Sequence, residues 1–338
     1  MVPKSNRKKQ DNEEVLAQVK RLLEEKGRET LELTKKLMLE REENIQCKEV
    51  REALHYFADN YWNDLARPTL ISITYEAVGG NCKTVTPIAA PIMLITAGID
   101  LHDDVIDQST VKNKRSTVFG KFGKDVTLLV GDALIFKGFI QLQLALERFQ
   151  QQKAAEVLKV IEKAFFELGD AEALELRFKG RMDVTPKEYL EIVRKKAADV
   201  EAYTHVSAVL GEGTKAETEA IRKFGRILGM LAIIRDDLID MTDEKELMHR
   251  LENEIVPLPI LYAAQSAEAR SSINLIQAKH QKTKEVAHRI LEITYQYDGF
   301  AHAEKKVCEL VEEGFLSLKP IQHKKEELRL LLNFMKTT

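Results

Sequence analysis

The chain has 338 residues, of which 44% are hydrophobic and 31% charged, and its formal net charge is −3. This composition supports a large core, and the small net charge gives no whole-chain argument for binding nucleic acid or a membrane surface. Its three cysteines (Cys47, Cys82 and Cys308) are too few and too widely spaced to indicate a disulfide framework or a zinc site. The sequence shows neither a secretory leader nor the roughly 18–20 uninterrupted apolar residues of a membrane span, so we expect a cytoplasmic protein.

Nearly every segment has its apolar residues at helical spacing, and only 8 prolines and 16 glycines interrupt the chain. The spacing predicts helices over 12–45, 48–66, 68–78, 87–107, 124–150, 152–179, 186–210, 215–240, 257–267, 269–281, 282–297, 300–316 and 321–336. No linker or clean internal repeat divides the chain. We therefore predict an N-terminal charged helical segment, residues 1–45, followed by one all-α domain, residues 46–338.

Two short acidic clusters of the same design follow long apolar stretches. Residues 103–107 and 236–240 each place aspartates at the first, second and fifth positions, and together they hold six of the chain's seventeen aspartates. The stretches before them, residues 87–99 and 227–234, are apolar on nearly all sides, which is typical of helices buried in a core. Carboxylates at the ends of two buried helices indicate a function.

These six carboxylates are expected to face one cavity. They are Asp103, Asp104, Asp107, Asp236, Asp237 and Asp240. In each cluster the first and last aspartates lie four residues apart, on one face of the helix. Carboxylates gathered in one cavity repel one another and raise one another's pKa values unless cations share the site. Because Mg²⁺ prefers such oxygen ligands and leaves positions for substrate phosphates, the sequence predicts a cavity where Mg²⁺ joins two aspartate walls to a diphosphate.

With these residues, the chain resembles the trans-isoprenyl diphosphate synthases, also called the polyprenyl synthetase family, in order over about residues 50–335. The aspartate clusters resemble the two aspartate-rich motifs of that family, and Arg67 with Pro68 resembles the end of its G-G-K-R-x-R-P segment. Residues 117–118, 131–134 and 195–197 resemble further family stretches. The resemblance implies a single-domain, isoprenoid-synthase-type bundle of helices around a deep central cavity, usually in a homodimer.

The resemblance also implies a reaction. Three Mg²⁺ ions held by the two motifs would bind the diphosphate of an allylic substrate, and the double bond of isopentenyl diphosphate would attack the allylic cation. Asp103, Asp104, Asp107 and Lys196 would be catalytic, and all six aspartates would be metal ligands. Substrates would be bound by Arg67, Lys112, Lys196 and Arg250, and we add Lys114 and Arg115 as candidates from outside the family pattern. Gly98 and Ile99 would lie on the floor of the product shaft, where the absence of a bulky aromatic favours products of about C20 or longer.

The departures from the family gather at the expected site for isopentenyl diphosphate. Asp64 stands where the family has a lysine, Thr96 where a histidine is common, and Asn113 where it has an arginine. Replacing a lysine by an aspartate removes a cation and adds an anion, which weakens diphosphate binding. Lys114 and Arg115 lie just beyond Lys112. Either they bind phosphate in place of the lost basic residues, from positions shifted along the chain, or they belong to a solvated loop.

Three functions stay open from the sequence. The favoured one is a chain-elongating synthase with an altered acceptor pocket. An enzyme that ionises the allylic diphosphate but cyclises it, as a terpene synthase does, or transfers it to a different acceptor, is the second. A non-catalytic subunit of a partner synthase is the third, although such a subunit would be expected to lose metal-binding aspartates and none is lost here.

Overall fold

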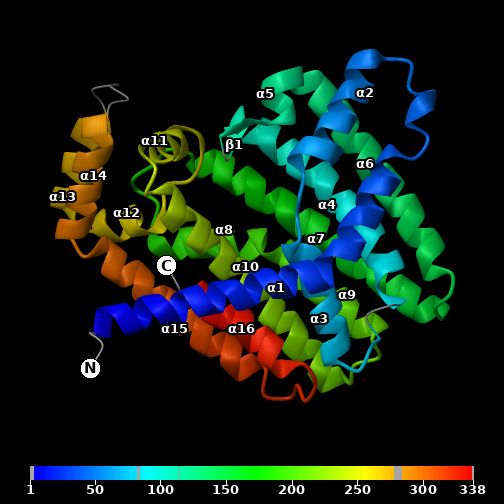
Figure 1. Cartoon of the computed structure of the whole chain (residues 1–338). Helices are drawn as coiled ribbons and strands as arrows, with labels where there is room; N and C mark the ends of the chain where they lie inside the picture. The colour runs from blue at the N-terminus through cyan, green and yellow to red at the C-terminus, as the bar shows by residue number, and fades with distance from the viewer. Residues whose placement is uncertain (1–3, 82–83, 113, 278–283, 337–338) are drawn as a thin grey trace.

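The computed structural model describes residues 4–81, 84–112, 114–277 and 284–336. Within these ranges, sixteen α-helices follow one another with short connections, and the single sheet is a two-stranded antiparallel hairpin (Figure 1). The predicted all-α class is confirmed. Cys82, Asn113 and the predicted junction near residues 281 and 282 lie outside the described residues.

The first half of the chain builds the wall that carries the first aspartate cluster. Its elements are α1 (Lys4–Leu39), the 3-10 helix η1 (Glu42–Asn44), α2 (Lys48–His55), the π-helix η2 (Tyr56–Tyr61), α3 (Ala66–Ala77), α4 (Thr86–Ile106), β1 (Val111–Lys112), β2 (Arg115–Ser116), α5 (Val118–Phe122) and α6 (Lys124–Leu146). Helix α4 packs along α6 and against α1, which runs across one side of the bundle (Figure 1).

The second half carries the other aspartate cluster. Its elements are α7 (Gln151–Phe178), α8 (Pro186–Lys196), α9 (Ala198–Leu210), α10 (Lys215–Asp240), α11 (Glu244–Asn253), α12 (Leu258–Ala263), α13 (Ala267–Gln277), α14 (Lys284–Gln296), α15 (Gly299–Ser317) and α16 (Lys325–Met335). Capping boxes at Thr185 and Thr214 satisfy the first amides of α8 and α10, which explains where both helices begin.

The apolar core forms two large clusters, and the central cavity lies where they meet. One cluster gathers around α4, α6 and α2, and the other around α10, α12, α15 and α16. Helices α4 and α10 end at Ile106 and Asp240, so each aspartate cluster closes the C-terminal end of its helix, as the sequence predicted. The negative end of each helix dipole therefore adds to the negative charge of the carboxylates.

Several boundaries differ from the expected ones. The helix predicted over 186–210 is two helices, α8 and α9, which meet at Ala197. The helix predicted over 48–66 ends as a π-helix at Tyr61, and the chain is not helical from Trp62 to Leu65. Helix α11 and the hairpin of β1 and β2 were not predicted, because short elements leave little periodicity to read.

Helix α6 is long and apolar enough to cross a membrane by length and composition alone. It carries Asp132 and Lys137 near its middle, and one side packs along α4. Its other side exposes Leu129, Phe136, Ile140 and Leu144. A core helix passes the same test, so this is weak evidence for a membrane span and clearer evidence for an uncovered apolar face.

The close crossing of α9 and α10 at Gly225 gives a first prediction. A Cβ at Gly225 would overlap the Thr204 hydroxyl, so Gly225→Ala should lower the free energy of unfolding by about 1–3 kcal/mol. Gly169→Ala is the matched control, because Gly169 is also helical but exposed, with open space beside it, and alanine there should be neutral or stabilising by up to about 1 kcal/mol. Chemical denaturation measures both, and equal effects would contradict this packing.

Candidate functional site

One aspartate of each cluster lines a common cavity of about 560 Å³, whereas the other four aspartates that were expected to face it do not line it. Asp103 at the end of α4 and Asp236 at the end of α10 both line it, together with Ile99. The remaining wall is largely apolar and comes from α1, α3, α7, α9 and α16. The structure therefore brings both predicted motifs to one cavity, although they are more than a hundred residues apart in the chain.

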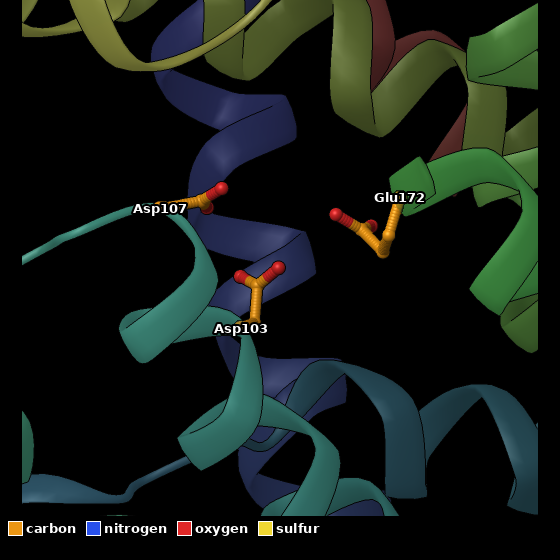
Figure 2. A group of neighbouring side chains, drawn as sticks. All are labelled: Asp103, Asp107 and Glu172. Carbon is orange, nitrogen blue, oxygen red and sulfur yellow. The ribbon is translucent and has the colours of Figure 1, made fainter. Parts of the chain in front are cut away.

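A group of three carboxylates forms the best candidate for a metal site among the described residues. Asp103 and Asp107 from α4 and Glu172 from α7 point toward one another (Figure 2), and each offers an oxygen within 4.8 Å of the other two. An all-oxygen group of this size fits the ligand preference of Mg²⁺. Burial raises the pKa of Asp107, and the neighbouring Asp103 raises it further, although the positive charge of Lys196 opposes the shift.

Glu172 was not predicted from the sequence. The sequence gives only one hint of its role, which is that Glu172 lies three residues before Glu175 on the same helix. Glu175 is buried in the structure. Lys196 forms ion pairs with both glutamates, and its Nζ lies 3.1 Å from Glu172 and 2.5 Å from Glu175. The predicted Lys196 thus lies close to the first motif.

Lys112 neutralises the rest of the first motif. Its Nζ lies 2.9 Å from Asp104 and 3.6 Å from Asp103. Burial raises the pKa of Asp104 to about 6, although Lys112 opposes the shift. Of the three basic residues predicted here, Lys112 alone contacts the aspartates. Lys114 and Arg115 are exposed at the hairpin, where Arg115 donates to the carbonyl of Asn60, so the structure does not bring them to the cavity.

The second motif is organised differently. Arg250 from α11 donates to Asp237 at 2.6 Å and to Asp240 at 2.7 Å, and Tyr189 donates its hydroxyl to the other oxygen of Asp237. Asp236 turns toward the cavity, and burial raises its pKa to about 6. Tyr189, which the sequence did not single out, therefore helps to fix Asp237 away from the cavity.

Arg67, predicted as the surviving basic residue of the acceptor site, is surrounded by acids. It lies 3.0 Å from Asp64, 3.1 Å from Asp100 and 3.8 Å from Asp199. Asp100 also accepts a hydrogen bond from the Trp62 indole. The side chains around Arg67 thus carry more negative than positive charge, which agrees with the predicted weakening of diphosphate binding at this end of the cavity.

The two residues predicted for the floor of the shaft separate in the structure. Ile99 lines both the cavity and a small apolar pocket beyond it, between α4, α7 and α9. A hydrogen bond of 2.8 Å between the Thr96 and Tyr203 hydroxyls lies at the boundary between these two spaces. Gly98 instead faces Gly131 and Ile135 of α6, because the two helices approach closely there, so it does not reach the cavity.

Comparisons with known proteins agree with this geometry. A family model described as polyprenyl synthetase matches residues 48–294. A short chain isoprenyl diphosphate synthase from Methanothermobacter thermautotrophicus is 28% identical over 73% of this chain and 70% of its own length. A geranylgeranyl diphosphate synthase from Methanosarcina mazei is 30% identical over 60% of this chain and 62% of its own length. The crystal structure of geranylgeranyl pyrophosphate synthetase from Pyrococcus horikoshii, 24% identical, has the same fold, with a TM-score of 0.79 over 96% of this chain and 98% of that one.

The acids around Arg67 give a second prediction. Arg67→Gln leaves three partly buried carboxylates without their shared cation, and near pH 8 it should cost about 2–4 kcal/mol of unfolding free energy. Burial raises the pKa values of Asp100 and Asp199, and Arg67 opposes both shifts. Without Arg67 the folded protein would bind protons at these carboxylates more tightly than the unfolded chain, so the loss should shrink as the pH falls toward 5.

Chemical denaturation of the Arg67→Gln variant and the wild type at both pH values measures this difference. Arg181→Gln is the control, since Arg181 pairs with Asp183 at an exposed position and its loss should cost less than about 1 kcal/mol. A loss for Arg67→Gln that is small, or equal at pH 8 and pH 5, would contradict the charge balance described here.

Proposed function

This chain belongs to the polyprenyl synthetase family, and we propose that it is a chain-elongating prenyltransferase that joins an allylic diphosphate to isopentenyl diphosphate. The observation that carries the proposal is the group formed by Asp103, Asp107 and Glu172, of which Asp103 and Glu172 line the same largely apolar cavity as Asp236. The named relatives, which include geranylgeranyl and octaprenyl diphosphate synthases, support products of about C20 or longer.

In the proposed reaction the C–O bond of the allylic diphosphate breaks, and the diphosphate leaves with the electron pair. The double bond of isopentenyl diphosphate then forms the new C–C bond, and a proton leaves the acceptor for the departed diphosphate. Bound Mg²⁺, for which we propose three ions, would neutralise the charge that develops on the leaving group. Lys112 and Lys196 would hold its oxygens, and the apolar walls would keep water from the allylic cation.

The metal ligands follow from the donor atoms. We propose that Asp103, Asp107 and Glu172 hold ions at the first motif, with Asp104 tied to Lys112 beside them. At the second motif Asp236 is the carboxylate that reaches the cavity, and Asp237 and Asp240 stand behind it. The metal-binding role of all six aspartates stays a prediction, and we propose that Asp103, Asp107 and Asp236 contribute most to it.

The surroundings of Arg67 favour a second candidate function. Because three carboxylates already pair with Arg67, its positive charge would attract an incoming diphosphate less strongly. A neutral acceptor, or cyclisation of the allylic substrate, would not require a diphosphate-binding arginine at this position. This supports an enzyme that ionises the allylic diphosphate without using isopentenyl diphosphate. The product assay below separates the two functions.

We also propose that the protein is a cytoplasmic homodimer. The outward face of α6 exposes Leu129, Phe136, Ile140 and Leu144, and α7 beside it in the chain exposes Phe166. Exposed apolar residues that gather on one helix face are typical of protein interfaces. The division into residues 1–45 and residues 46–338 stays a prediction.

A Mg²⁺-dependent product assay tests the function. The purified protein receives geranyl, farnesyl or geranylgeranyl diphosphate, with and without isopentenyl diphosphate, and longer prenyl diphosphates should form only when isopentenyl diphosphate is present. Asp103→Ala and Asp236→Ala should each lower turnover by at least about 100-fold while the fold is kept, because each removes a ligand and relieves repulsion. Asp183→Asn, at an exposed ion pair, should leave turnover unchanged.

Hydrocarbons or alcohols formed from the allylic substrate alone would support the second candidate instead. Near-normal turnover by Asp103→Ala or Asp236→Ala would show that the site has been assigned to the wrong residues.

The dimer is tested by substitution on α6. Phe136 is 70% exposed in the single chain, so Phe136→Lys should leave the fold intact and convert a dimer into a monomer, because it buries a charge in the interface. Tyr295→Lys is the control, since Tyr295 is similarly exposed but lies on α14. Light scattering after size-exclusion chromatography measures the mass. A monomeric wild type, or a dimeric Phe136→Lys variant, would exclude this interface.

A further inference from the structure

We propose that Arg250 is a tethered cation that keeps the second aspartate motif closed until a diphosphate binds, and that it then moves onto the diphosphate. The inference rests on the proposed function, because it concerns the order in which the same cavity takes up its charges. The starting observation is an asymmetry: the first motif keeps Asp107 without an ion pair among the described residues, whereas one guanidinium binds two of the three aspartates of the second motif.

Arg250 binds two carboxylates of the second motif and one carboxylate outside it. Its Nη1 lies 2.6 Å from Asp237 and 3.0 Å from Glu254, and its Nε lies 2.7 Å from Asp240. The planar guanidinium with its five donors is well suited to bridging several carboxylates in this way, which an ammonium group cannot match. Because Tyr189 donates to the second oxygen of Asp237, both oxygens of that carboxylate already have a partner.

Asp236 is the one aspartate of the second motif that remains available. It lines the cavity, and within the described part of the chain its carboxylate makes no ion pair or hydrogen bond of its own. A single free carboxylate binds a divalent cation weakly in the absence of other ligands. At the first motif, by contrast, Asp103, Asp107 and Glu172 converge, and Lys112 is bound mainly to Asp104.

The backbone around Arg250 suits a movement of the side chain alone. Helix α11 begins at Asp243, whose side chain accepts hydrogen bonds from the amides of Lys245 and Glu246. Leu247 and Leu251 hold the helix in the core. Arg250 itself does not line the cavity, but it holds Asp237, which directly follows the cavity-lining Asp236 at the end of α10. A diphosphate in the cavity would offer the guanidinium charge-assisted hydrogen bonds in exchange for those to Asp237 and Asp240.

Two consequences follow for the order of binding. Divalent ions alone should fill the first motif and leave the second closed. A diphosphate, by drawing Arg250 away, should free Asp237 and Asp240 to join Asp236, so that the last ion enters only with the diphosphate. Removal of the guanidinium should open the second motif in the absence of any diphosphate.

The test counts Mn²⁺ bound to the full-length protein, from the free-ion signal in electron paramagnetic resonance, with and without inorganic pyrophosphate. The wild type should bind at least one more ion when pyrophosphate is present. Arg250→Gln should bind that additional ion without pyrophosphate. Arg222→Gln is the matched control, because Arg222 also lies on α10 and bridges two carboxylates, Glu201 and Glu219, but contacts neither aspartate motif, so its loss should keep the wild-type count.

Arg250→Lys carries the test if Arg250→Gln does not fold. A lysine keeps the positive charge but cannot bridge Asp237 and Asp240 as the guanidinium does. Without pyrophosphate, the additional Mn²⁺ should therefore bind about 10-fold more tightly to Arg250→Lys than to the wild type. The proposal is overturned if Arg250→Gln and the wild type bind equal numbers of ions without pyrophosphate. It is also overturned if pyrophosphate adds no further ion to the wild type. The count needs no turnover, so a protein that shows this pattern but makes no product would contradict the proposed function alone.

Discussion

Repulsion among carboxylates in a partly buried cavity is the constraint on which the rest of this structure depends. Unpaired charges are costly where water is scarce, so every acidic group in the cavity that is withdrawn from solvent needs a cation nearby. Four ion pairs provide these cations: Lys112 pairs with Asp104, Lys196 with Glu175, Arg250 with Asp237 and Arg67 with Asp100. These four basic residues come from four different elements, so the charge balance ties distant parts of the bundle together.

The apolar packing explains how the balance is maintained. Two apolar clusters meet at the cavity, and α4 and α10, one from each, end at its rim with their aspartates. The close crossing of α9 and α10 at Gly225 and the break at Ala197 direct Lys196 and Asp199 into the same space. A shift of either helix would move acids and bases together, so packing and electrostatics stabilise the same arrangement.

The charges are distributed unevenly, and this distinguishes the two ends of the cavity. Near the first motif, Lys112 and Lys196 neutralise acids while leaving Asp107 without an ion pair among the described residues, which is suited to metal ions and a diphosphate. Near Arg67 the acids outnumber the base, so that end repels anions. The family fold is therefore kept, and the region around Arg67 differs in charge from the region around the first motif.

The sequence by itself determined the helical class, because periodic apolar residues report local structure, and it determined the two aspartate motifs, because the same spacing recurs behind two buried helices. It also pointed to Lys112, Lys196 and Arg250. It did not show Glu172, Tyr189 and Asp199, which are single polar residues on amphipathic helices. Only the tertiary structure decided that Gly98 faces α6, that Lys114 and Arg115 point to solvent, and that Arg250 closes the second motif. The physical reason is that periodicity reflects interactions within a few residues, whereas the pairing of charges depends on distances between helices that only the packed core sets.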